Sequence, residues 1–215
     1  MAFWHRLMKL PKIKSLKDSN YAFLFTPTVP GDYVCFDCES TGLNPRTDRI
    51  ITLSALRIRE GEILSSQALE LWLAQPQRIA PESIKVHQIR NQDLQLQEGP
   101  LLSEQEAMSQ FLHFIQGATL VGYYVTFDIA LVERIVQPWL GVRLPNPRLD
   151  VSELYYRHKA KHWRHGIYQS SVDLRFSAIL ADLQLPNLGQ HQAFNDALMT
   201  ALIFCKLQRL GDERC

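Results

Sequence analysis

Two acidic residues separated by a single residue, Asp37 and Glu39, stand near the end of an apolar stretch of this 215-residue chain. Aromatic and β-branched residues followed by Ser-Thr-Gly predict a β-strand over residues 33–39 that runs into a turn. Because strand side chains alternate between two faces, both carboxylates point one way, while Val34 and Phe36 point into a core. Neighbouring carboxylates repel each other unless a cation lies between them. The pattern predicts a cation site, and the alternative is a solvated edge strand with two unrelated acids.

Two further acids fall at the starts of predicted helices. Asp128 stands where an apolar strand gives way to a helix, the position at which α/β sheets bind ligands, although alone it could equally cap that helix. Asp196 lies early in an apolar helix, five residues after His191. Since a helix turns about 100° per residue, this pair does not share a helical face, and we expect His191 in the preceding loop, over the same cleft. The alternative for the pair is an ordinary surface helix.

The elements that must position these residues follow an order typical of an α/β domain. We expect an antiparallel hairpin after the first strand and then alternating helices and short strands, which gives a mixed central sheet flanked by helices. The capping-box pair Ser103 and Glu106 marks one helix start, and Pro138 is expected to end another helix. The expected ranges are strands 50–59, 62–73, 119–122 and 148–151 and helices 82–86, 107–115, 127–136, 174–183 and 193–210.

The composition describes a folded domain without a global electrostatic signature. Hydrophobic residues make up 46% of the chain and the formal net charge is +1, so any nucleic-acid contact must rest on a local patch. The sequence contains no run of 18 apolar residues, so it predicts no membrane-spanning helix. Lysines interrupt the apolar residues near the N-terminus, which argues against a secretory signal peptide, and we expect a cytoplasmic protein. Cys35 and Cys38 form a C-x-x-C pair that could suggest zinc or redox chemistry, but strand spacing favours two core thiols in a reducing compartment.

Residues 1–30 are expected to form a basic amphipathic extension, followed by one domain over residues 31–215. Lysines and arginines alternate there with apolar residues, and Pro11 interrupts any single helix. Such a segment could lie on a membrane surface, hold nucleic acid, or pack on the domain or on a partner protein. Packing or partner contact, for example with a polymerase, is the interpretation that we favour.

Three motifs in order carry a family resemblance. Asp37-x-Glu39-Ser-Thr-Gly42, then Phe127-Asp128, then His191-x-Ala-x-x-Asp196 resemble the exonuclease motifs of the DEDDh (DnaQ-like) 3′→5′ exonucleases, which include the epsilon proofreading subunit of DNA polymerase III. The resemblance covers roughly residues 32–207. It implies a ribonuclease H-like fold.

The resemblance also implies a catalytic set. Asp37, Glu39, Asp128 and Asp196 would hold two divalent cations, and His191 would be the general base on the attacking water. The hard oxygen ligands suit Mg²⁺ or Mn²⁺.

By the same resemblance, the turn after the first strand would hold the terminal nucleotide, and Leu43 would pack against its base. The segment around His87 also resembles the family. The sequence departs from it at Tyr123-Tyr124, where relatives usually carry His-Asn. The expected substrate-binding residues are Ser40, Thr41, Gly42, Leu43, His87, Tyr124 and Phe127.

Residues 155–168 favour nucleic-acid binding independently of the family. Four Lys/Arg, three His and four aromatic residues occur there without an acid, and such a mixture can neutralise phosphates and stack on unpaired bases. A solvated loop is the alternative, and a zinc site from its histidines is a weaker one. The expected strand contacts are Arg157, Lys159, Lys161, Trp163 and Arg164.

The sequence therefore predicts a metal-dependent 3′→5′ exonuclease that acts on single-stranded or unpaired 3′ ends, with DNA slightly favoured. RNA processing or oligonucleotide degradation is the alternative within the family. A nucleic-acid-binding module that keeps the fold but hardly cleaves is the alternative from another class, and only Tyr123-Tyr124 supports it.

Overall fold

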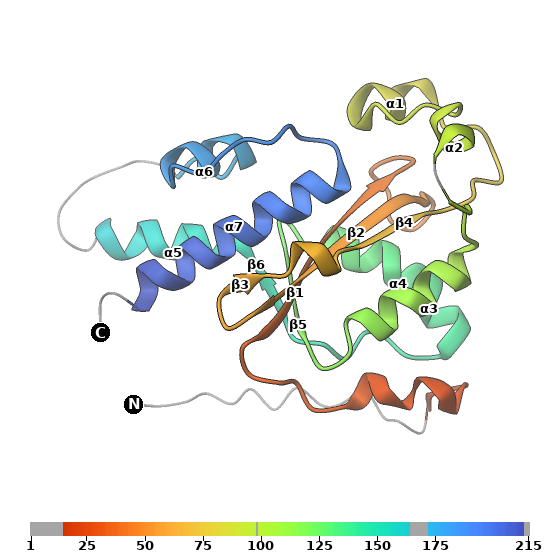
Figure 1. The fold of residues 1–215 in the computed structure, drawn as a ribbon, viewed down its shortest axis with the longest axis horizontal. Helices are drawn as coiled ribbons and strands as arrows, with labels where there is room; N and C mark the ends of the chain where they lie inside the picture. The colour runs from red at the N-terminus through yellow and green to blue at the C-terminus, as the bar shows by residue number, and fades with distance from the viewer. Residues whose placement is uncertain (1–14, 98, 164–171, 213–215) are drawn as a thin grey trace.

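A mixed six-stranded sheet, in the order β3-β2-β1-β5-β6 with β4 also paired to β2, forms the centre of the molecule (Figure 1). The structure is a computed structural model and describes residues 15–97, 99–163 and 172–212. Neighbouring strands β1 and β2 are antiparallel, whereas β5 and β6 run parallel to β1. The strands are β1 Asp32–Ser40, β2 Ile50–Arg59, β3 Glu62–Ile63, β4 Leu69–Trp72, β5 Thr119–Gly122 and β6 Arg148–Asp150.

Helices cover both faces of this sheet. On one face α3 and α4 enclose a core that contains Phe36 and Phe111, and on the other α7 packs across β1, β2 and β5 together with α5 and α6. The expected α/β fold with a mixed sheet is confirmed. The helices are α1 Pro81–His87, α2 Asp93–Leu96, α3 Glu104–Phe114, α4 Thr126–Leu140, α5 Val151–Trp163, α6 Phe176–Asp182 and α7 Ala193–Asp212, with 3-10 turns η2 Ser19–Phe25 and η3 Ser65–Gln67.

Strand β1 follows the predicted alternation. Val34, Phe36 and Cys38 join the core under α3 and α4, whereas Cys35 joins the core under α7. The two thiols of the C-x-x-C pair are therefore buried on opposite sides of the sheet, and opposite sides cannot supply one metal site. The capping box at the start of α3 is also present, with Ser103 and Glu106 each bonding the backbone of the other.

Three expected ranges were wrong. The predicted strand 62–73 is broken by the exposed polar turn η3, after which β4 pairs again with β2. Helix α4 continues through Pro138 to Leu140, and Lys17 bonds two carbonyls of its last turn: its backbone N–H donates to the Leu140 carbonyl and its Nζ to the Pro138 carbonyl. Residues 155–163, where no helix is expected, continue helix α5, whose Tyr155 is buried against α7.

The described part of the N-terminal extension packs on the domain. Tyr21 and Leu24 are buried in the core under α3 and α4, and the Tyr21 hydroxyl donates to Ser109 Oγ at 2.9 Å. Residues 1–14, which hold most of the basic side chains, lie outside the described residues. The boundary at residue 30 and contact with a partner stay predictions.

Candidate active site

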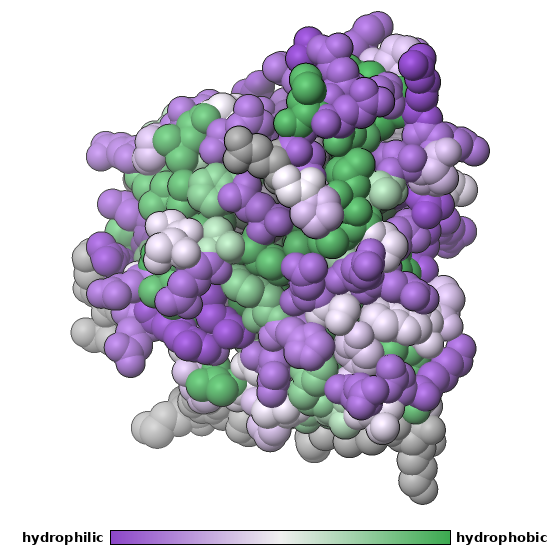
Figure 2. Space-filling view, turned by 45° about the vertical axis from the view of Figure 1, so that its right-hand side comes forward, coloured by the Kyte–Doolittle hydropathy of each residue, from purple (hydrophilic) through white to green (hydrophobic). Residues whose placement is uncertain are grey.

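A cleft of about 790 Å³ opens at the end of β1, where the turns after β1 and β5 and the start of α7 meet. Its lining combines carboxylates with aromatic side chains, and Figure 2 shows hydrophobic residues exposed in a band across one face of the molecule. Parallel strands β1 and β5 are neighbours, so both turns lie at the same edge of the sheet. The predicted site residues that line the cleft are Asp37, Glu39, Ser40, Gly42, Leu43, His87, Tyr124, Phe127, Asp128, His191 and Asp196.

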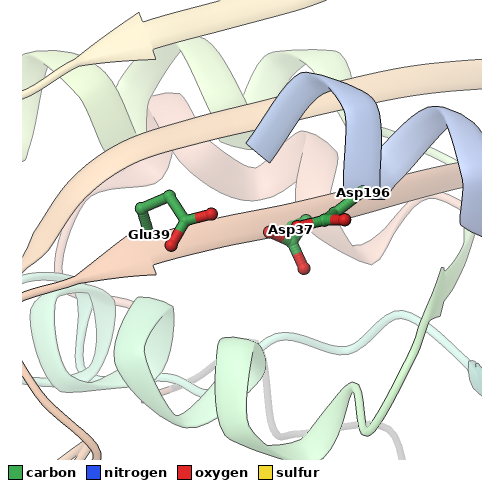
Figure 3. A group of neighbouring side chains, drawn as sticks. All are labelled: Asp37, Glu39 and Asp196. Atoms are coloured by element: carbon green, nitrogen blue, oxygen red, sulfur yellow. The ribbon is translucent and has the colours of Figure 1, made fainter. Parts of the chain in front are cut away.

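Three carboxylates converge in this cleft (Figure 3). Asp37 and Glu39 come from β1 and Asp196 from the first turn of α7, and one oxygen of each lies within 4.8 Å of the others. The alternation predicted for β1 thus places both of its acids on the face that α7 covers. One Asp196 oxygen, Oδ1, is buried without a hydrogen-bond partner. A buried carboxylate oxygen without a partner is costly, so the group suits a cation.

Asp128, the fourth predicted acid, is buried in the first turn of α4 and lies beside this group rather than within it. Its Oδ1 accepts a hydrogen bond at 3.1 Å from the backbone N–H of Cys38. That bond connects α4 to β1 between Asp37 and Glu39. The structure therefore brings three of the four acids close enough to share one cation and places the fourth in the lining of the same cleft.

Burial and mutual repulsion raise the pKa values of these acids in the metal-free protein. Burial raises the pKa of Asp37 well above its ordinary value, and Asp128, Asp196 and Glu39 add repulsion. Burial, with repulsion from Asp196, raises the pKa of Glu39 to about 7. Burial also raises the pKa values of Asp128 and Asp196. Ionising these carboxylates in the metal-free protein therefore costs electrostatic free energy, and a bound cation would remove that cost.

Two histidines flank the acids. His191 is exposed in the loop before α7, with φ +68°, and its backbone N–H donates to Asp196 Oδ2 at 2.8 Å. The predicted place of His191 over the cleft is confirmed, and its backbone also orients Asp196. His87 is buried, and its Nδ1 accepts from the Ile89 N–H at 3.0 Å, which places the ring proton on Nε2. Burial and the nearby His191 lower the pKa of His87.

The turn that carries Leu43 is built around an acid that sequence reasoning missed. Asp48 accepts from Thr41 Oγ1 at 3.0 Å and from the Asn44 N–H at 2.8 Å, while Ser40 Oγ donates to the Gly42 carbonyl at 2.7 Å. This network presents Leu43, which is 88% exposed, at the mouth of the cleft. Thr41 itself does not line the cleft and acts through the turn.

Gly42→Ala is expected to disturb this turn. A Cβ at Gly42 would lie 2.6 Å from Asp48 Oδ2, so Asp48 must give up its bonds to the turn. We expect a stability loss of about 1–2 kcal/mol and a KM for nucleic acid raised roughly tenfold. Urea denaturation and initial rates measure the two effects. Gly211→Ala, where an added Cβ meets nothing within 4 Å, is the matched control; equal behaviour of both variants would contradict the role of the turn.

The turn after β5 depends on a second acid that the sequence did not reveal. Asp150 in β6 accepts from the Val125 N–H at 3.1 Å and from the Ser152 N–H at 2.9 Å. The first bond fixes the turn that carries Tyr124, and Phe127 lines the cleft one helical turn further on. The sequence does show that Asp150 stands at the end of an expected strand. It does not show that this strand, β6, lies beside β5, which is seen only in the strand order of the sheet.

The basic segment 155–168 is placed apart from the cleft as far as the structure describes it. Arg157 pairs with Glu153 on the same helix, and Lys159 pairs with Asp182 at 2.9 Å. Neither basic residue lines the cleft. The side chains of Lys161 and Trp163, and all of residues 164–171, lie outside the described residues. Strand contacts by this segment stay a prediction.

The mixed sheet flanked by helices and the acidic cleft at the end of β1 suit a nuclease with a ribonuclease H-like fold. A sequence profile described as "Exonuclease" (RNase_T) matches residues 34–204. The chain therefore belongs to this exonuclease family, and the resemblance to DnaQ-like enzymes is confirmed.

Relatives and solved structures agree with this assignment. The chain is 29% identical over 178 residues to the DNA polymerase III epsilon subunit of Aquifex aeolicus, covering 82% of this chain and 80% of that protein. It is 29% identical over 188 residues to the PolC-type DNA polymerase III of Caldanaerobacter subterraneus subsp. tengcongensis, but covers 12% of that polymerase. Exonuclease I from Methylocaldum szegediense shares the fold over 85% of this chain and 41% of its own, with a TM-score of 0.67 at 18% identity.

A second similar structure is exonuclease I of E. coli in complex with a dT13 oligonucleotide. Its TM-score is 0.66 at 16% identity, covering 85% of this chain and 43% of that one. At this identity the likeness establishes the fold alone. Within the described ranges, no helix combines the length and apolarity needed to cross a membrane.

Proposed function

We propose that this chain is a metal-dependent 3′→5′ exonuclease that releases nucleoside 5′-monophosphates from single-stranded or unpaired 3′ ends, with DNA slightly favoured. The observation that carries the proposal is the convergence of Asp37, Glu39 and Asp196 in an open cleft, with Asp196 Oδ1 buried and unpartnered. Structural acids normally have partners. Among the described residues, no Lys or Arg forms an ion pair with Asp37, Glu39 or Asp196, so these acids suit a cation and, through it, a phosphate.

The donor set fits hard divalent cations. Asp37, Glu39, Asp128 and Asp196 would hold two ions, Mg²⁺ or Mn²⁺, since carboxylate oxygens are the ligands that these ions prefer. Bound there, the ions would lower the pKa of water and stabilise charge on the departing 3′ oxygen.

The protein's own groups would supply the proton transfer. His191 projects from the loop before α7 into the cleft and would take the proton from the attacking water. Its backbone bond to Asp196 couples the position of this base to a metal ligand. The reaction would leave a nucleoside 5′-monophosphate and a shortened strand with a 3′ hydroxyl.

The substrate would enter between two cleft walls. The turn of Ser40 to Leu43 would hold the terminal nucleotide, with the exposed Leu43 side chain against its base. His87 would donate from its ring proton on Nε2, the atom that has no partner within the described residues. Phe127 would contribute apolar surface beside Asp128.

A role beside a polymerase is the biological setting that we favour. Two similar proteins are named as DNA polymerase III components, and exonuclease I has been solved with oligonucleotides. We infer a cytoplasmic protein that binds nucleic-acid 3′ ends and whose N-terminal extension contacts a polymerase or another protein. RNA processing or oligonucleotide degradation remains the alternative role for the same site.

Product analysis with matched substrates tests the proposal. Single-stranded DNA, single-stranded RNA and blunt duplex DNA of one sequence would be incubated with Mg²⁺ or Mn²⁺, and the products separated by chromatography. We expect nucleoside 5′-monophosphates from both single strands, faster from DNA, and little from the duplex. Faster release of nucleotides from RNA than from DNA would favour RNA processing as the function. Binding to single strands without any product would support the binding module instead.

A further inference from the structure

The cleft contains an aromatic column that the proposed reaction does not use. The rings of Tyr123 and Tyr124 lie 4.5 Å apart between centroids, and those of Tyr123 and Phe176 lie 4.8 Å apart. All three residues line the cleft. The column joins the turn after β5 to the start of α6, segments about fifty residues apart in the chain.

The inner part of this column is fixed in place. Tyr123 lies between the other two rings, and its hydroxyl donates to the Leu174 carbonyl at 2.8 Å. The turn is held from the far side by the bond from the Val125 N–H to Asp150. A ring that packing already fixes loses little freedom when a ligand stacks on it.

The outer end of the column is exposed under backbone strain. Tyr124 is 52% exposed and has φ +49°, a conformation that bulky residues rarely adopt and that Asn and Gly tolerate better. A large apolar ring held in that conformation at the rim of a site is a strained residue of the kind that marks functional sites. Packing of the core does not explain it, because half of the side chain faces solvent.

The cleft thus presents two exposed large apolar side chains, Leu43 and Tyr124. Leu43 follows β1 and Tyr124 follows β5, so they project from adjacent strand ends with the acidic group between these strands and α7. Leu43 is already assigned to the terminal base. A second face on another wall of the same cleft suits the next base along the strand, because every base offers a flat face to an aromatic ring.

We propose that Tyr124, supported by Tyr123 and Phe176, is the stacking platform for the base of the second nucleotide from the 3′ end. This inference rests on the proposed function. If the second base must stack on Tyr124, the exonuclease is selective for ends with at least two unpaired nucleotides, because a base-paired second nucleotide is not available for stacking. Such stacking also makes Tyr124 a specificity-determining residue whose aromatic face, rather than its hydroxyl, binds the strand.

Binding measurements in an inactive background test this platform without requiring hydrolysis. Asp37→Asn protein would be titrated with a fluorescent single-stranded oligonucleotide, intact or abasic at the first or second position from the 3′ end. Tyr124→Ala is expected to weaken binding of the intact strand roughly 5- to 100-fold. It should not weaken binding of the strand that is abasic at the second position. Tyr124→Phe, which keeps the face, should restore binding.

Two further variants guard against trivial explanations. Tyr124→Asn removes the ring but suits φ +49°, so it should lose binding while its melting temperature stays at or above that of the parent. Leu96→Ala removes another large apolar side chain, 77% exposed on α2 outside the cleft, and should bind as the parent does.

In the active background the same contact predicts a raised KM with little change in kcat, because stacking is made in the ground state and in the transition state alike. Two results would overturn the role of Tyr124 as a stacking platform. One is that Tyr124→Ala binds the strand abasic at the second position more weakly than the intact strand, by the same factor as the parent. The other is that the affinity lost in Tyr124→Ala depends on the base at the first position instead of the second. Absence of cleavage by the wild type on every substrate would instead overturn the proposed function, and the binding titration would still decide the role of Tyr124.

Discussion

Asp37→Asn is expected to abolish most of the nuclease activity and to stabilise the metal-free protein. Burial raises the pKa of Asp37 well above its ordinary value, and repulsion from Asp128, Asp196 and Glu39 raises it further. Removing one ligand charge should lower kcat/KM on the order of 10³-fold, or about 4 kcal/mol of transition-state stabilisation. The amide also relieves repulsion, so the free energy of unfolding at pH 8 without metal should rise by about 1–3 kcal/mol.

Initial rates and urea denaturation in EDTA measure these opposite effects. Glu70→Gln removes one charge from an exposed position on β4, away from the cleft, and should change neither quantity appreciably. A loss of stability equal to the loss of activity would mean that Asp37 serves the fold. Full activity in the variant would exclude Asp37 from the site.

Divalent cations are expected to stabilise the protein, and more strongly at pH 8 than at pH 5.5. A cation at 100 times its dissociation constant adds about 2.7 kcal/mol, which corresponds to a melting temperature roughly 5–10 °C higher for a chain of this size. At pH 5.5 the ion must displace protons, because burial and repulsion raise the pKa of Glu39 to about 7 and those of its neighbours above their ordinary values. The shift should therefore shrink as the pH falls.

The metal-free protein should show the reverse trend. Folding raises the pKa values of these acids, so their protonated forms stabilise the folded state. This contribution to stability is fully present below their unfolded pKa values, about 4. It is lost as the pH rises through the folded pKa, which is about 7 for Glu39. Thermal melts in EDTA and in Mg²⁺ across this range, with Asp37→Asn beside the wild type, measure both trends. An equal Mg²⁺ shift in the two proteins, or no shift at pH 8, would contradict a metal site at these acids.

The sequence was informative where chemistry follows from local geometry. Strand alternation placed Asp37 and Glu39 on one face, and helical geometry placed His191 in the loop before α7. The positions of Asp128 and Asp196 beside β1 followed from the family motifs. No local pattern could show that the fourth acid bonds the Cys38 backbone, because that bond joins residues 90 positions apart.

The missed features all depend on tertiary contacts. Asp48 and Asp150 shape the two turns of the cleft through backbone bonds that no residue type predicts alone. Helix α4 ends beyond Pro138, at Leu140, where Lys17, far away in sequence, bonds carbonyls of its last turn. Residues 155–163 are rich in basic and polar residues, so the sequence predicts no helix there, yet they belong to helix α5 and Tyr155 packs near α7.

The direction of degradation is the most direct test of the central claim. A single-stranded 20-mer DNA with a 5′ label would be incubated with wild-type protein in Mg²⁺, with EDTA and Asp37→Asn as controls. We expect a ladder of labelled products that shorten one nucleotide at a time from the 3′ end, present only with wild-type protein and metal. Early appearance of a labelled mononucleotide, or an intact 20-mer throughout, would contradict the assignment of this cleft as a 3′→5′ exonuclease site.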